Sequence, residues 1–165
     1  SYFCYWWENE NTNYPYEFEK DGLMLLSVAD KENPGWNHTV VYDLNARKLV
    51  NNQVYESLYL PDYKERPMLY TQDPDHWYGY LNDNFVPMAI YADATTFSNG
   101  YALVSHDKKT YSIINENLEV VVPNAFAANV ATNMGHGLFE LGYSSPDDPY
   151  NYTSYKYVYI GPQYE

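Results

Sequence analysis

Short apolar runs that begin at a glycine or a turn recur along this chain. Within each run the residues are apolar at alternate positions or at several in succession, which is the pattern of a strand. The first and third runs begin at Gly22 and Gly100, 78 residues apart, and the fourth begins at Gly137, 37 residues later. The second run lies near the middle of the longer gap, so the spacing predicts four repeats. The runs occupy residues 22–28, 66–70, 100–105 and 137–141.

A second apolar segment follows each run, at residues 40–44, 77–81, 111–114 and 155–160. After the first three of these come polar turns at 45–47, 82–84 and 115–117, and then short apolar segments at 49–50, 85–86 and 118–121. Asn and Asp favour tight turns between strands. We therefore expect an all-β chain of about four stacked antiparallel hairpin-like repeats that form an elongated or curved sheet. A partial β-propeller is the alternative.

The repeat also sets the expected organisation of the chain. We expect an N-terminal capping strand or arm over residues 1–17 and a repeat domain over 18–165, with units near 18–60, 61–96, 97–132 and 133–165. Neighbouring units must stack because one unit cannot bury its own apolar face. The loop after the first strand is expected to be long at 29–38 and 144–154 and a direct hairpin at 106–109. An Ala-rich segment, 124–132, is the one helix candidate.

One stretch carries a motif with recognisable order and spacing. Trp77 and Gly79-Tyr80-Leu81-Asn82 are followed by Tyr91-Ala92-Asp93-Ala94 and then by Phe97-Ser98-Asn99-Gly100-Tyr101-Ala102-Leu103-Val104. This stretch resembles the WG β-repeat of bacterial proteins, in which Trp-Gly-Tyr-Ile-Asp leads through Tyr, Asp and Ala to Phe-x-x-Gly-Leu-Ala-x-Val. It departs from that pattern because Tyr78 separates the tryptophan from the glycine.

The resemblance covers residues 77–121 well and 18–160 loosely. It implies a structural scaffold with a binding role, usually in exported or surface proteins, so an extracellular or cell-surface location is expected. It brings no catalytic residues to carry over. It also implies that the repeat tryptophan packs in the core, and we expect this of Trp77.

Charge and composition narrow the classes of partner. The formal net charge is −13, from 22 acidic residues against 9 Lys and Arg. Phosphate backbones and anionic membranes both require clustered basic residues, so we expect no nucleic-acid partner. No apolar run approaches the roughly 18 residues of a membrane span, so we expect no membrane insertion. Cys4 is the sole cysteine, which excludes an internal disulfide and a four-cysteine zinc site.

Motifs that would indicate a catalytic or metal-binding site are weak in this sequence. Asp73, Asp75 and His76 could place two ligands on one loop, but a solvated turn ahead of a strand explains them better. His38, His76 and His106 lie at comparable places in their repeats without the spacing of paired metal ligands. No Gly-x-Ser-x-Gly elbow and no Gly-rich phosphate loop is present. The sequence predicts no enzyme, no cofactor and no metal site.

Aromatic residues are the strongest functional signal, because 21 of the 165 residues are Tyr. Tyr and Trp on loops serve protein contacts as hot spots, and their rings can also stack on sugars. We expect a non-enzymatic scaffold that binds a protein partner through exposed aromatic residues, with a carbohydrate-binding surface as the alternative. The residues expected to make the contact are Trp36, Tyr143, Tyr150, Tyr152 and Tyr155.

Overall fold

The computed structural model describes residues 17–18, 23–29, 32–33, 37–59, 68–72 and 77–161, and these residues form four antiparallel sheets. Sheet A contains β1 (Glu17–Phe18), β2 (Leu23–Ala29), β3 (Asn37–Asp43) and β4 (Lys48–Leu49). Sheet B contains β5 (Ser57–Tyr59), β6 (Met68–Gln72), β7 (Trp77–Leu81) and β8 (Pro87–Tyr91). Sheet C contains β9 (Asp93–Ala94), β10 (Tyr101–Ser105), β11 (Thr110–Asn115) and β12 (Val120–Ala127). Sheet D contains β13 (Val130–Gly135), β14 (Leu138–Ser145) and β15 (Asp148–Tyr159).

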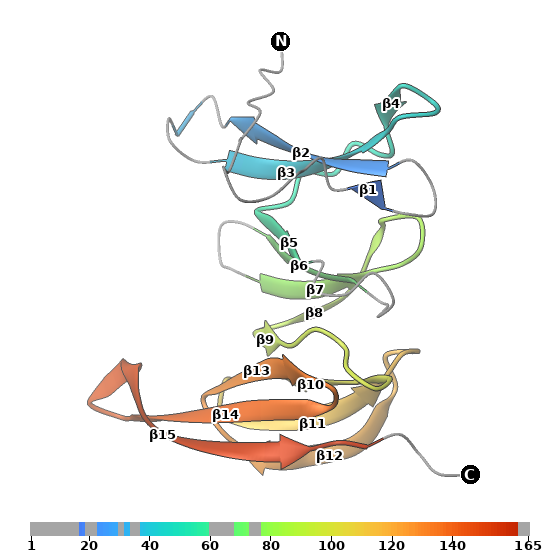
Figure 1. The fold of residues 1–165 in the computed structure, drawn as a ribbon. Coiled ribbons are helices and arrows are strands. Elements are labelled where there is room, and N and C mark those ends of the chain that lie inside the picture. Colours follow the sequence, from blue (N-terminus) through green and yellow to red (C-terminus); the bar gives the residue numbers. More distant parts are fainter. Residues whose placement is uncertain are drawn as a thin grey trace.

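Every paired strand in these sheets neighbours its partner in the sequence, so each sheet is a simple meander. Sheet A lies at the top of Figure 1, sheet B lies below it, and sheets C and D make up the lower part. The expected all-β architecture of about four stacked antiparallel repeats is confirmed. The apolar runs that begin at a glycine or a turn are the second strand of each sheet, and the segments that follow them are the third.

Three separate cores hold the stack together, one between each pair of successive sheets. The core between sheets A and B contains Leu23, Val41, Tyr55, Tyr70, Leu81 and Phe85. Sheets B and C enclose Leu69, Tyr80, Tyr91, Ala94, Phe97, Ala102, Val104 and Ile114. Sheets C and D enclose Leu103, Tyr111, Ala128, Ala131, Phe139 and Leu141. Each sheet is therefore buried by its neighbours in the stack, as the repeat predicts.

The two middle sheets are buried on both faces. In β6, Leu69 packs in the core with sheet C while Tyr70 packs in the core with sheet A. In β7, Tyr80 packs in the core with sheet C and Leu81 packs in the core with sheet A. Successive strand residues point to opposite faces, so a strand between two cores needs apolar residues at consecutive positions. This explains why the apolar runs of the sequence are continuous rather than strictly alternating.

Buried tyrosines hydrogen-bond across the cores with their hydroxyl groups. The Tyr55 hydroxyl donates to the carbonyl oxygen of Phe85 at 2.6 Å. The Tyr80 hydroxyl donates to the carbonyl oxygen of Thr95 at 2.7 Å. Both side chains are fully buried, so the bonds satisfy groups that would otherwise lose their hydrogen bonds to water.

The helix expected at residues 124–132 is wrong. Residues up to Ala127 belong to β12, and residues from Val130 belong to β13. Phe126 pairs with Tyr111, and Ala127 pairs with Thr110. A segment of this length is marginal as a helix. Its first part pairs with β11, with register shifts in that pairing, and its residues from Val130 pair with β14.

Two further expectations are wrong. The long loop expected at residues 144–154 is a hairpin, because β14 runs to Ser145 and β15 begins at Asp148. Trp77 is not in the core, since 46% of its surface is exposed at the start of β7. The direct hairpin at 106–109, between β10 and β11, is confirmed. No helix in the described part of the chain has the length and apolar character to span a membrane.

Candidate partner-binding face

The side chains of β14 and β15 divide between two faces of sheet D. The two strands pair in one register from Leu138 opposite Tyr159 to Tyr143 opposite Ser154. Residues directly opposite each other share a face, and Phe139 and Val158 pack inward against sheet C. Tyr155, Tyr157 and Tyr159 therefore lie on the other face of the sheet.

We call this side the outer face of sheet D. Strand β13 adds Val130 and Thr132 to it, because they pair with Gly142 and Glu140. The face thus consists of Val130, Thr132, Leu138, Glu140, Gly142, Tyr155, Tyr157 and Tyr159. Glu140 is the one charged residue among these, in a chain with a net charge of −13. The outer face is therefore much less acidic than the chain as a whole.

The three tyrosines expose large parts of their rings. Exposure is 50% for Tyr155, 59% for Tyr157 and 66% for Tyr159. The Tyr157 hydroxyl donates to Oε2 of Glu140 at 2.7 Å, and this contact raises the pKa of Tyr157. The Tyr155 hydroxyl donates to the carbonyl oxygen of Tyr152 at 3.2 Å. Two of the three hydroxyl groups are thus bonded to sheet D itself, which fixes the orientation of their rings before any partner arrives.

Gly142 lies beneath the side chains of this face. A Cβ atom placed on Gly142 would lie 2.5 Å from Cγ1 of Val130 and 3.5 Å from Cε1 of Tyr155. The aromatic ring and the valine therefore close over the glycine from its two neighbouring strands. Because the position has no side chain, a tyrosine ring can lie against the sheet there.

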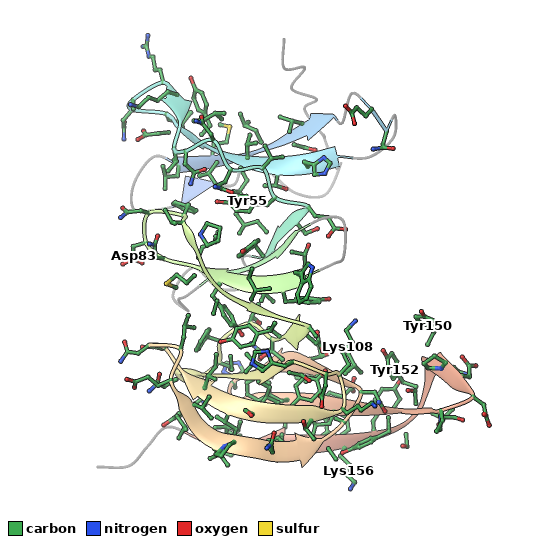
Figure 2. The ribbon with its side chains drawn as sticks, turned by 180° about the vertical axis from the view of Figure 1, so that it is seen from behind. Tyr55, Asp83, Lys108, Tyr150, Tyr152 and Lys156 are labelled. Atoms are coloured by element: carbon green, nitrogen blue, oxygen red, sulfur yellow. The ribbon has the colours of Figure 1, made fainter. Side chains whose placement is uncertain are left out.

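The β14–β15 hairpin projects beyond the rest of sheet D, as Figure 1 shows. Register shifts on either side of Ser144 mark where it bends away from the regular ladder. Tyr150 lies near its tip with 91% of its surface exposed, and Tyr152, further along the same strand, is half-buried. Figure 2 shows Tyr150 pointing away from the body of the protein.

The structure brings together some of the residues that the sequence predicts to contact a partner. Tyr150, Tyr152 and Tyr155 all lie on β15. Tyr143 faces inward, where it packs on the core shared with sheet C and lies 5.5 Å from Nζ of Lys156. Trp36 lies outside the described residues. Sequence reasoning missed Tyr157 and Tyr159, although the alternation Tyr155-Lys156-Tyr157-Val158-Tyr159 is the signal that places three tyrosines on one face of a strand.

A buried polar pair lies elsewhere, between sheets C and D. The Tyr111 hydroxyl donates to Oδ2 of Asp93, and both residues are buried. Burial raises the pKa of Asp93, although hydrogen bonds from Tyr111 and from the backbone of Ala94 and Ala131 oppose that change. The pair is enclosed by the core and bonded on all these sides, so we interpret it as a structural contact.

The histidine and acidic motifs form no metal site in the part of the chain that is described. No group of three or more His, Cys, Asp or Glu side chains lies close enough to hold a metal ion there. The His106 ring instead lies beside Tyr91, with 5.2 Å between ring centroids. Asp73, Asp75 and His76 lie outside the described residues.

Comparison of the chain with protein-family models, curated proteins and solved structures finds no match.

Proposed function

We propose that this chain is a non-enzymatic binding module that holds a protein partner against the outer face of sheet D. The observation that carries the proposal is the row Tyr155, Tyr157 and Tyr159, exposed side by side with a single charged neighbour. Tyrosine is enriched in the cores of protein interfaces, and charged residues are depleted there. Exposed apolar surface of this kind typically marks a contact site.

A protein partner fits this face better than a sugar does. Sugar recognition needs hydrogen-bonding groups beside the aromatic ring, and the hydroxyls of Tyr155 and Tyr157 are already bonded within sheet D. The neighbours Val130 and Leu138 are aliphatic. A sheet face with fixed rings and aliphatic neighbours suits the apolar centre of a protein interface.

Kinship to the WG β-repeat and a location at the cell surface are part of this proposal. The position of the Phe97–Val104 part of the motif supports the proposed kinship. The Phe97–Val104 stretch supplies part of the core between sheets B and C, including Phe97, Ala102 and Val104. The same strand position is glycine-led in sheets A and D as well.

The test is site-specific photo-crosslinking in an extract of the source organism. A benzophenone amino acid replaces Tyr157 in one variant and Ile90 in a matched control. Ile90 is 55% exposed on β8 of sheet B, so it has similar exposure but lies on another sheet. We expect a discrete crosslinked protein from position 157 and none of that mass from position 90.

Two results would contradict the proposal. Equal products from both positions would indicate non-specific contact, and no product at all would remove the outer face as a partner site. A glycan array, with and without Ca²⁺, runs in parallel. Specific glycan binding that is lost in Tyr157→Ser would replace the protein partner with the carbohydrate alternative.

A further inference from the structure

Strand β15 has one edge that no other described strand covers. The order of sheet D is β13-β14-β15, so β15 pairs with β14 on one side only. With 12 residues, it is the longest strand in the described part of the chain. An uncovered edge presents a row of unpaired N–H and C=O groups, which can pair with another strand.

The backbone groups of the three exposed tyrosines point to that edge. The N–H of Ile160 donates to the carbonyl oxygen of Gly137 at 2.8 Å, which continues the register between β14 and β15. In an antiparallel strand, alternate residues direct both backbone groups to the same side. Even-numbered positions from 154 to 160 therefore face β14, and Tyr155, Tyr157 and Tyr159 direct their N–H and C=O groups away from it.

Charge also distinguishes this edge. The chain has 22 acidic residues in 165, on average one in every 7.5 residues, yet residues 149–164 contain none. Lys156 is the one charged residue in that stretch. Two copies of a chain with net charge −13 repel each other, and residues 149–164 add no carboxylate to that repulsion. The Glu140 carboxylate, which accepts from the Tyr157 hydroxyl, lies on the neighbouring strand β14.

We propose that β15 pairs with β15 of a second copy of this chain, antiparallel, about a two-fold axis at Tyr157. In this register Tyr157 faces the partner's Tyr157, and Tyr155 faces the partner's Tyr159. All three tyrosines then exchange backbone hydrogen bonds, and Lys156 lies opposite the partner's Val158. An axis at Lys156 would place two lysines opposite each other, which is unfavourable. An axis at Val158 would leave Tyr155 opposite Gly161, beyond the end of the strand.

The dimer goes beyond the proposed function because it requires no other protein. A two-fold axis perpendicular to the sheet keeps both outer faces on the same side, so six strands would carry one continuous row of tyrosines. The contact is short and belongs with interfaces below about 1,200 Å² of total buried area, which are typically weak and transient. We therefore expect a reversible monomer–dimer equilibrium rather than a permanent dimer.

The first test locates the axis by cysteine crosslinking in a Cys4→Ser background, which has no other thiol. A hydrogen-bonded antiparallel pair holds its Cα atoms about 5.5 Å apart, within disulfide range. Tyr157→Cys should therefore form a disulfide dimer under mild oxidation. Tyr155→Cys should not, because its two copies lie four residues apart along the strands, roughly 13 Å. A mixture of Tyr155→Cys and Tyr159→Cys should crosslink.

The second test uses sedimentation velocity over a range of protein concentrations. The unmodified chain should shift from 19.3 kDa towards twice that mass as its concentration rises. Tyr157→Pro removes the N–H at the axis and should weaken association by about tenfold or more. Tyr157→Thr removes the ring but keeps the N–H, so it should weaken association less.

Three results would overturn the dimer. The first is a single mass of 19.3 kDa at every concentration. The second is equal crosslinking of Tyr155→Cys and Tyr157→Cys, which would indicate random collision. The third is unchanged association of Tyr157→Pro. Each variant is compared with the unmodified chain by circular dichroism, so that loss of folding is recognised. A photo-crosslink to a different protein does not depend on whether the chain dimerises. The proposed protein partner and the proposed dimer can therefore fail separately.

Discussion

Tyr111 of β11 and Asp93 of β9 form a buried hydrogen bond at the junction of the last two sheets. Backbone N–H groups of Ala94 and Ala131 also donate to the Asp93 carboxylate. Ala131 belongs to β13, so one carboxylate joins three strands from sheets C and D. A buried carboxylate is tolerated only when hydrogen bonds replace its lost hydration, and here several donors converge on it.

The Asp93 carboxyl should make folding stability depend on pH. Burial raises its pKa above the usual value of 3.8, so the folded state holds this proton more tightly than the unfolded chain does. The free energy of unfolding should therefore fall as pH rises from the unfolded pKa through the folded one. Asp93→Asn cannot titrate. Urea unfolding between about pH 4 and pH 7 should show the advantage of the unmodified chain over this variant shrinking as pH rises. Parallel stability curves would contradict this assignment.

Tyr80→Phe should destabilise the protein by about 1–2 kcal/mol, because it leaves the buried carbonyl oxygen of Thr95 without its donor. Tyr150→Phe is the matched control, since Tyr150 is 91% exposed, and it should change stability by less than about 0.5 kcal/mol. Denaturant unfolding measures both. Equal effects of the two variants would mean that the buried bond contributes nothing to stability.

Gly137→Ala should destabilise by about 2 kcal/mol or more. The φ angle of Gly137 is +79°, and an added Cβ would lie 2.4 Å from the carbonyl oxygen of Ile160, which is backbone and cannot move aside cheaply. Gly135 has a φ angle of +92° with no atom within 4 Å of an added Cβ. Gly135→Ala should therefore show the cost of the backbone angle alone, about 1 kcal/mol. Thermal unfolding of the pair separates the two causes, and similar losses would show that the steric clash relaxes.

Phe139→Ala and Leu138→Ala test which side of β14 faces the core. Phe139 is fully buried between sheets C and D, whereas 38% of the surface of Leu138 is exposed on the outer face. We expect losses of about 3–5 kcal/mol for Phe139→Ala and below about 1.5 kcal/mol for Leu138→Ala. A larger loss at Leu138 would place the core on the opposite side of sheet D.

The positions of the central strands were largely predictable from the sequence, because the apolar runs that begin at a glycine or a turn are central strands buried on one or both faces. The order of the strands was not, because an apolar pattern does not say which strands pair. Residues 100–105 and 77–81 became β10 and β7 almost without change. The first strand of each sheet escaped prediction. Strand β9 is only Asp93–Ala94, and a strand of two residues has no hydrophobic period to read. The alanine content of residues 124–132 favours a helix locally, whereas pairing with β11 and β14 decides the outcome.

The candidate site was predictable in part. The sequence predicts a contact site that includes three tyrosines of β15. A pattern of aromatic residues does not show which face of a strand lacks a neighbouring sheet. Tyr143 and Tyr155 look equivalent in the sequence, yet Tyr143 packs against sheet C and Tyr155 lies on the outer face. The repeat motif predicts that Trp77 packs in the core, whereas its position at the start of β7 leaves it exposed.

The meander topology has a consequence for how the chain folds. Each sheet pairs only strands that are adjacent in the sequence, so every ladder closes a short loop. Short loop closure is entropically cheap, and chains dominated by such contacts fold faster than other all-β proteins. Individual meanders can therefore form early, and the slow step becomes their docking through the three cores. Under mechanical load the same division should let sheets separate one interface at a time.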